Sequence, residues 1–266
     1  MYPEKIFDMS LPYPGRDSEK LVRVFVPEHE EGETFPVIYM TDGQNLFEDN
    51  HPMQFGCWYT REAVRAESKN EGQAAVIVGI YNNDGPEQRA NELTPKSIGR
   101  LEGPEEIRSR ISPSGELFDD FVINTVMPAV EAHFPVMTGR NNTAFCGSSS
   151  GGLQTFFTVL THTDKFCAGG VFSPPFMFYS FEDLTKWIHE KIKPDMPYLY
   201  IYTGAGDELE KIIYQSTEMT YDVLTECYPA EKLNEVILLE NRHHETAWAE
   251  IFKDFLHTFL TRRNEF

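Results

Sequence analysis

The stretch Cys146-Gly147-Ser148-Ser149-Ser150-Gly151-Gly152 places a serine between two glycines in the order G-x-S-x-G. An apolar run precedes it and a helical pattern follows it, so the sequence predicts a strand, a sharp turn and a helix, with Ser149 at the tip of the turn. Glycines beside such a serine let the strand and the helix approach closely. Ser149 is therefore a candidate nucleophile for acyl transfer, although the same letters in isolation also fit a flexible glycine and serine loop.

An acid that could serve this serine follows later in the chain, as the order of one large class of serine triads requires. The apolar run 198–202 predicts a buried strand that breaks at a glycine-containing turn. Asp207 is the first acid after this turn, and its carboxylate is expected to orient a catalytic histidine. Glu208 and Glu210 are close enough in sequence to compete for that role.

Two adjacent histidines follow the last predicted strand, 236–239, and precede a helix expected from 246 to 262. His243 is expected to act as the general base and acid, with His244 as its competitor. Together with Glu245 the pair superficially resembles a metal-binding cluster. Adjacent side chains point apart, however, and helical zinc sites space two histidines four residues apart. We therefore expect no metal and no other cofactor.

The elements around these residues alternate between strands and helices. Continuous apolar runs at 36–40, 74–80 and 144–146 predict buried parallel strands, and 21–26 alternates as an antiparallel edge hairpin does. A helix is predicted over 117–133 from its apolar spacing. The fold class is thus α/β, with a mostly parallel central sheet, helices on both faces and an antiparallel N-terminal edge. Functional groups of such sheets gather at the carboxyl ends of the strands.

Composition limits the remaining possibilities. The chain has 266 residues, 41% of them hydrophobic, and a formal net charge of −19. This length fits a single domain, 1–266, and the charge argues against nucleic acid or an anionic membrane as a partner. No signal peptide or membrane span is recognisable, so a cytoplasmic location is expected. Four scattered cysteines favour reduced core thiols over a disulfide framework. The sequence leaves the oligomeric state open.

The loop 40–47 follows an early strand, at the place where hydrolases of this order supply one backbone amide to an oxyanion hole. Gln44 is the expected donor, and the second is the amide of Ser150, the residue after the nucleophile. Asp42-Gly43 by itself is also an ordinary turn signal.

A second loop, 81–95, contains Arg89 and Glu92, which we expect to form a local ion pair that braces the loop. Contact with the substrate is the alternative for this arginine. The aromatic segment 172–181 is expected to lie partly in the core and partly along an acyl or aryl pocket. The candidate substrate-binding residues are Asp42, Gly43, Arg89 and Phe176.

Five blocks of sequence, in this order, resemble the Putative esterase family of α/β-hydrolases. The family includes enterochelin, feruloyl and acetylxylan esterases, S-formylglutathione hydrolase and mycolyltransferases. The blocks extend from about residue 20 to residue 260. They are Tyr39-x-x-Asp42-Gly43-Gln44-Asn45-Leu46-Phe47, Arg89-x-x-Glu92-Leu93-Thr94-Pro95, Gly147-x-Ser149-x-Gly151-Gly152-Leu153, Phe172-Ser173-Pro174 and His243-x-Glu245-x-x-Trp248.

This resemblance implies an α/β-hydrolase fold and a serine hydrolase that cleaves a small-molecule carboxylic ester through an acyl-enzyme on Ser149. The histidine that opens the family's last block corresponds to His243, and the acid after a glycine-containing strand end to Asp207. Ser150 departs from the family, where a bulkier residue is frequent. Acyl transfer or thioester cleavage on the same fold is the nearest alternative. A non-catalytic binding module is the alternative from another class.

Overall fold

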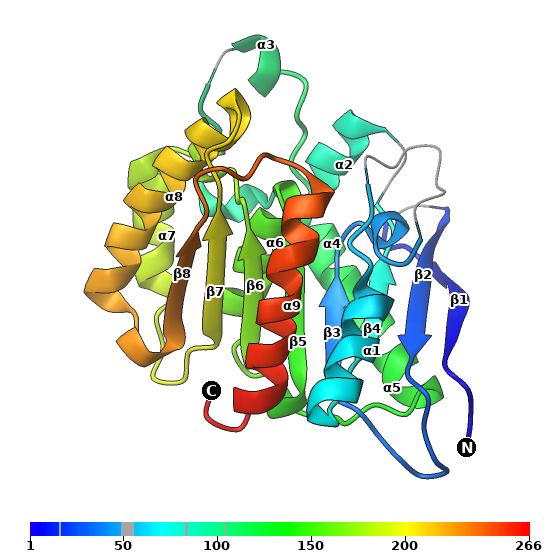
Figure 1. Cartoon of the computed structure of the whole chain (residues 1–266). Helices are drawn as coiled ribbons and strands as arrows, with labels where there is room; N and C mark the ends of the chain where they lie inside the picture. Colours follow the sequence, from blue (N-terminus) through cyan, green and yellow to red (C-terminus); the bar gives the residue numbers. More distant parts are fainter. Residues whose placement is uncertain (16, 49–55, 83–84, 104) are drawn as a thin grey trace.

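The computed structural model describes residues 1–15, 17–48, 56–82, 85–103 and 105–266. Eight strands form one sheet in the order β1-β2-β4-β3-β5-β6-β7-β8 (Figure 1). The pairs β1-β2 and β2-β4 are antiparallel and all the others are parallel. The strands are β1 (Lys5–Pro12), β2 (Glu19–Val26), β3 (Val37–Met40), β4 (Val76–Ile80), β5 (Thr143–Ser148), β6 (Ala168–Phe172), β7 (Tyr198–Thr203) and β8 (Leu233–Ile237).

Helices cover both faces of this sheet. Helices α1 and α9 pack together on one face, whereas α4, α6, α7 and α8 lie on the other (Figure 1). The predicted fold class is therefore confirmed, with its antiparallel N-terminal edge. The helices are α1 (Thr60–Glu71), α2 (Pro86–Glu92), α3 (Glu105–Arg108), α4 (Gly115–Phe121), α5 (Met127–His133), α6 (Ser150–Thr161), α7 (Phe181–Lys191), α8 (Glu208–Cys227) and α9 (Glu245–Arg262).

The central parallel strands are buried on both faces, which explains their continuous apolar runs. One strand prediction needs correction and one strand was missed. The last strand is β8, which ends at Ile237, and the next residues, Leu238 and Leu239, are exposed. Strand β6 was not predicted, because its Gly169-Gly170 pair is typical of a turn. A Cβ at Gly170 would collide with Cys146 Sγ on β5, so close packing requires glycine there.

The helix predicted over 117–133 is interrupted. Between α4 and α5 the chain forms a π-helical turn, η3 (Val122–Val126). Pro128 lies in the first turn of α5 and has no N–H to donate to the preceding turn. A proline ring inside a helix also clashes with the carbonyl four residues earlier. The wider turn accommodates this proline while the helix continues to cover the sheet.

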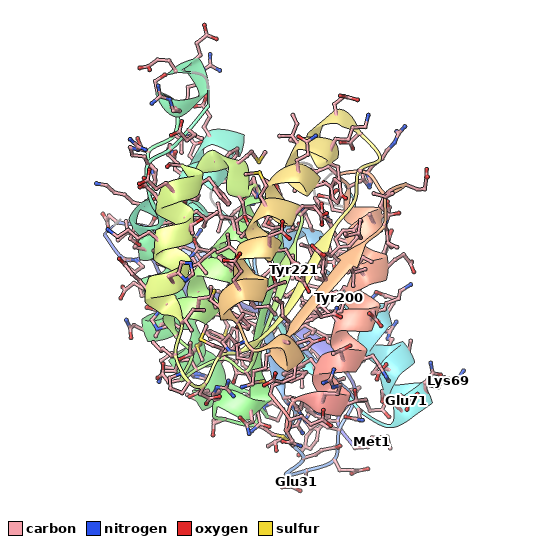
Figure 2. The ribbon with its side chains drawn as sticks, turned by 90° about the vertical axis from the view of Figure 1, so that its left-hand side faces the viewer. Met1, Glu31, Lys69, Glu71, Tyr200 and Tyr221 are labelled. Atoms are coloured by element: carbon pink, nitrogen blue, oxygen red, sulfur yellow. The ribbon has the colours of Figure 1, made fainter. Side chains whose placement is uncertain are left out.

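The topology brings functional loops to one end of the molecule. The parallel strands all end on the side where α3 protrudes, whereas both chain termini lie at the opposite end (Figure 1). Figure 2 agrees, with Met1 and Glu31 far from α3. Strands β5, β6, β7 and β8 are consecutive neighbours in the sheet, so the residues that follow them lie in one row. Among the described residues, no helix is long and apolar enough to cross a bilayer.

Candidate active site

Ser149 lies between β5 and α6 in a strained backbone conformation, with φ 56° and ψ −128°. This geometry projects the serine from the turn, and it explains the flanking glycines. A Cβ at Gly147 or Gly151 would collide with the Thr41 hydroxyl on the neighbouring loop. A Cβ at Gly152 would lie 2.5 Å from the Phe172 carbonyl oxygen. The predicted strand, sharp turn and helix are present.

A histidine and a carboxylate complete a chain of contacts from this serine. His243 Nε2 lies 3.0 Å from Ser149 Oγ, and His243 Nδ1 lies 2.6 Å from Glu210 Oε2. Glu210 is fully buried in the first turn of α8. A carboxylate only accepts hydrogen bonds, so this contact places a proton on Nδ1 and leaves Nε2 as the acceptor for the serine hydroxyl. The structure thus places a serine hydroxyl, an imidazole and a buried carboxylate in one row of contacts.

The geometry contradicts the expectation that Asp207 contacts the imidazole. Asp207 is the N-cap of α8, where its Oδ1 accepts from the Glu210 N–H at 2.9 Å. Its Oδ2 accepts from the His243 backbone N–H, also at 2.9 Å. Burial alone would raise the pKa of Asp207, but these backbone N–H groups hold it below its ordinary value. The Asp207 side chain thus holds the backbone of the histidine loop, and the longer Glu210 side chain reaches the His243 ring.

His244 plays a different structural part. It is the N-cap of α9, and its Nδ1 accepts from the Thr246 N–H at 3.2 Å. The side chain is exposed, whereas that of His243 is largely enclosed. Of the two adjacent histidines, the structure therefore brings His243 to Ser149 and uses His244 to begin the last helix.

The loop expected to supply an oxyanion donor forms a 3-10 turn, η1 (Gly43–Asn45). Asp42 precedes it in the left-handed region, with φ 55°. Gly43 packs directly on β4, because a Cβ there would lie 2.5 Å from the carbonyl carbon of Gly79. Ser150 is the first residue of α6, so its N–H is among those that a helix leaves without an internal acceptor. Of the two predicted oxyanion donors, Gln44 therefore lies in η1 and Ser150 in the first turn of α6, directly after Ser149.

Arg89 binds Asp42 and not Glu92, contrary to the predicted local ion pair. Its Nε lies 2.6 Å from Asp42 Oδ1 and its Nη2 lies 2.7 Å from Asp42 Oδ2, a bidentate contact. The same Nη2 donates to the Ser148 carbonyl at 3.2 Å. Glu92 instead pairs with Lys20 in the buried interior. Burial alone would raise the pKa of Asp42, but the Arg89 guanidinium holds it below its ordinary value.

A second link joins the oxyanion turn to the histidine loop. Asn45 Nδ2 donates to Glu245 Oε1 at 3.3 Å, and both side chains are buried. Burial raises the pKa of Glu245 above its ordinary value. Neither this link nor the Arg89 contact with Asp42 was predicted. The only sequence signal was that all four residues lie in the blocks shared with the resembled family.

The predicted substrate-binding residues are mostly enclosed. Phe176 is 2% exposed and packs edge-on against Phe156, so it belongs to the core and does not line an open acyl pocket. Gly43 and Asp42 are also buried. In the loop 81–95, residues 83–84 lie outside the described part of the chain. Arg89 is the most accessible of the four candidates, with its side chain 25% exposed.

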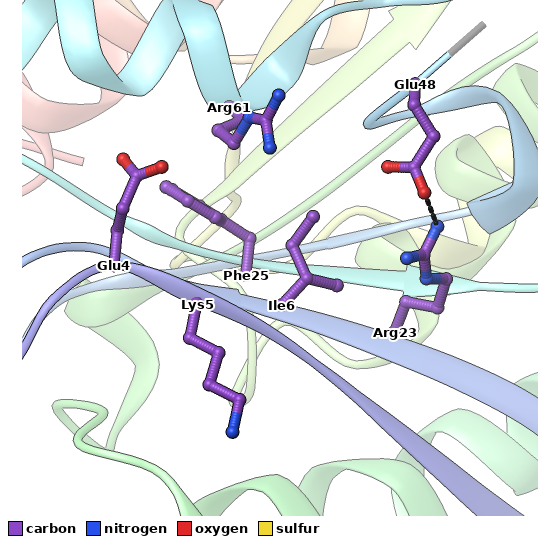
Figure 3. A pocket seen from close by; sticks show the side chains of 7 residues that line it. All are labelled: Glu4, Lys5, Ile6, Arg23, Phe25, Glu48 and Arg61. Atoms are coloured by element: carbon purple, nitrogen blue, oxygen red, sulfur yellow. Dashed lines mark hydrogen bonds and ion pairs between the residues drawn. The ribbon is translucent and has the colours of Figure 1, made fainter.

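A cavity of about 410 Å³ lies elsewhere, beside the N-terminal hairpin (Figure 3). It contains no residue of the Ser149 site. Arg23 Nη1 at its wall donates to Glu48 Oε1 at 2.9 Å, and Glu4 is paired with Arg65. Because it lies apart from Ser149, we assign it no role in the chemistry. Within the described ranges, no cluster of three or more histidine, cysteine, aspartate or glutamate side chains has the geometry to hold a metal ion.

Comparison with known proteins gives a family and distant relatives. Residues 16–245 match the family described as "Putative esterase". "Uncharacterized protein YbbA" from Bacillus subtilis (strain 168) is 24% identical over 181 residues, which cover 66% of this chain and 64% of that protein. The "Endo-1,4-beta-xylanase/feruloyl esterase" of Xylanibacter ruminicola is 23% identical over 176 residues, or 66% of this chain and 20% of that protein. The chain thus matches less than two thirds of the length of either relative.

A solved structure shares the fold. The IroE-like serine hydrolase from Shewanella oneidensis superposes with a TM-score of 0.71 at 18% identity, over 94% of this chain and 78% of the other. A likeness at this identity establishes the arrangement of the chain and not the substrate. Together with the family match, it confirms the predicted α/β-hydrolase fold.

Proposed function

This chain belongs to the Putative esterase family of α/β-hydrolases, and from that premise we propose that it is a serine hydrolase that cleaves carboxylic esters through an acyl-enzyme on Ser149. The observation that carries the proposal is the continuous contact from Ser149 Oγ through His243 to Glu210. A serine hydroxyl is a weak nucleophile near neutral pH and needs such a base. The family match supports a hydrolase that acts on esters, and the site chemistry supports the finer statement.

In the first half of the reaction, His243 Nε2 takes the Ser149 proton as Oγ bonds to the acyl carbon. Glu210 stabilises the imidazolium that forms, through the Nδ1–H contact. The negative charge on the former carbonyl oxygen is stabilised by the backbone N–H groups of Gln44 and Ser150. When the bond to the leaving alcohol breaks, His243 returns the proton to that alcohol.

In the second half, water attacks the acyl-enzyme and gives its proton to the same Nε2. The bond between the acyl carbon and Ser149 Oγ breaks, and the serine recovers its proton. An alcohol in place of this water would give acyl transfer, and a thioester in place of the ester would use the same steps. These alternatives differ from hydrolysis in the products, so product analysis separates them.

The test is covalent labelling together with a panel of esters. A fluorophosphonate probe is expected to add once, at Ser149, and the Ser149→Ala variant is expected to lose both labelling and turnover. Ser148→Ala is the matched control and is expected to keep both. The panel contains p-nitrophenyl acetate, p-nitrophenyl butyrate and methyl ferulate, the last because one relative is named a feruloyl esterase. Full labelling of Ser149→Ala, or parent-like activity of that variant, would contradict the assignment.

A further inference from the structure

Ser173 lies at the end of β6, between the strand that leads to Ser149 and the strand that leads to Glu210. Its backbone is tied to both neighbours. The Ser173 N–H donates to the Tyr202 carbonyl at 2.7 Å, and the Phe172 carbonyl accepts from the Ser149 N–H at 2.9 Å. Ser173 is completely buried, so its side chain acts only on protein groups around it.

The hydroxyl of Ser173 joins an indole to the buried carboxylate. It lies 2.5 Å from Glu210 Oε1 and 3.0 Å from Trp248 Nε1. An indole nitrogen only donates, so Trp248 occupies an acceptor site of the hydroxyl. The single hydroxyl proton is then directed to Glu210. The direction of both hydrogen bonds follows from the chemistry of the two partners.

Glu210 consequently has different partners on its two oxygens. Oε1 accepts from the Ser173 hydroxyl and from the Gly204 N–H, the latter at 2.9 Å. Oε2 is left to accept from His243 Nδ1. Trp248 also packs edge-on against the His243 ring, with the ring centroids 4.9 Å apart. The Trp248 indole therefore contacts both the His243 imidazole and the Ser173 hydroxyl that holds the Glu210 carboxylate.

The backbone of Ser173 supports a specific role for its hydroxyl. Its φ is 44°, in the left-handed region that glycine adopts freely and that costs free energy for a residue with a Cβ. Glycine would fit this conformation without strain. The serine side chain therefore contributes something that glycine cannot, and its contacts identify this as the hydrogen bond to Glu210.

We propose that Ser173, oriented by Trp248, is a positioning residue that holds the Glu210 carboxylate toward His243 during catalysis. This inference rests on the proposed ester hydrolysis at Ser149. Ser173 touches no reacting atom and acts only through the carboxylate. Loosening that carboxylate lowers the rate of the chemical step, whereas substrate binding is unaffected.

Ser173→Gly removes the hydroxyl without straining the backbone and is the main test. Removing a hydrogen bond to a charged group costs a free energy that corresponds to about a 10- to 100-fold loss in rate. We expect a loss of about this size in kcat, with KM changed less than about twofold. Trp248→Phe keeps an aromatic ring and removes the N–H, and its kcat is expected to fall about threefold to tenfold. A change in KM alone, or full activity of Ser173→Gly, would overturn the proposal.

The matched control is Thr217→Val on α8. Thr217 is fully buried, and its hydroxyl has no hydrogen-bond partner in the part of the chain that the structure describes. Loss of this hydroxyl is expected to leave kcat within about twofold of the parent, because it acts on no group of the site. The control separates loss of any buried hydroxyl from loss of the one on Glu210.

A double-mutant cycle with Glu210→Gln distinguishes a positioning role from a general structural one. If Ser173 acts through the carboxylate, Ser173→Gly has little further effect once Glu210 is an amide. Equal losses in both backgrounds would contradict the proposal. The His243 Nδ1 proton gives a readout that needs no substrate. Its downfield proton NMR signal is expected to weaken or shift in Ser173→Gly, so the inference is testable even if no ester of the panel is cleaved.

Discussion

Two buried carboxylates flank Ser149, and they have opposite kinds of partner. Asp42, on the β3 side, makes a bidentate contact with the Arg89 guanidinium. Glu210, after β7, contacts the His243 imidazole and two neutral donors. An arginine stays protonated throughout the pH range of most enzymes, whereas an imidazole exchanges its proton near neutrality. In the proposed reaction, a carboxylate therefore has a structural role on one side and a chemical role on the other.

This difference predicts which property of the protein a substitution on each side would change. The arginine side fixes the oxyanion turn and the carbonyl of Ser148, so it acts on geometry and stability. In the proposed reaction, the imidazole side carries the proton that moves. Variants on the first side are expected to affect folding and catalysis together, and variants on the second to affect catalysis with little loss of stability.

The largest expected effect comes from the imidazole itself. His243→Ala removes the base and is expected to lower kcat by at least about 10⁴-fold, while the melting temperature changes little. His244→Ala is the neighbouring control, and it is expected to lose activity less than tenfold, with a helix-cap cost of about 1 kcal/mol. Steady-state kinetics and thermal melting of both variants provide the check. A greater activity loss in His244→Ala would move the base to that residue.

The arginine side is tested by Asp42→Asn, which leaves the Arg89 guanidinium without its counter-ion. Breaking a buried ion pair from one side is expected to cost about 3 kcal/mol of unfolding free energy. The oxyanion turn loosens with it, so kcat is expected to fall about 100-fold. Asp8→Asn, in an exposed pair with Arg23, is the control and is expected to change stability by less than about 0.5 kcal/mol. Urea denaturation measures the unfolding free energy of both variants, and equal stabilities would contradict a structural role for Asp42.

A third carboxylate has acidic neighbours in place of a cation. Burial and the nearby Glu218 and Asp222 raise the pKa of Glu235 on β8 to about 7. The folded state thus binds this proton more tightly than the unfolded state, and stability falls as pH rises from about 4.5 through 7. Glu235→Gln is expected to be more stable than the parent by about 1 kcal/mol at pH 8, with no gain at pH 4. Melting curves at both pH values test this, and a gain confined to the acidic side would reverse the assigned sign.

Much of this site could be predicted from local sequence. Ser149 follows from the glycine pattern, because the turn needs glycine at fixed positions. Asp207 has the sequence of an N-cap, and the pattern Asp-x-x-Glu is itself a helix-start signal. That signal indicated a helix at 208–210, yet it could not show which carboxylate faces the imidazole. The choice depends on side-chain length and on the approach of the His243 loop from another strand.

The contacts that escaped prediction join residues far apart in sequence. Arg89 reaches Asp42 across 47 positions, whereas Glu92, only three residues away, pairs with Lys20 on β2. Sequence proximity favoured the wrong partner, because α2 presents these two side chains to different neighbours. Ser173 was visible only as part of a shared block. Its role depends on the sheet order, which places the end of β6 between those of β5 and β7.

The most direct test of the account compares Glu210→Gln with Asp207→Asn. Asparagine is as good an N-cap as aspartate, and its amide oxygen keeps one of the two backbone N–H contacts of Asp207, so Asp207→Asn is expected to stay within about tenfold of the parent in kcat. Glu210→Gln cannot stabilise the imidazolium and is expected to lower kcat by about a thousandfold while the fold is retained. The account predicts this ranking in kcat measured on a p-nitrophenyl ester at neutral pH. A crippled Asp207→Asn beside a nearly normal Glu210→Gln would contradict it.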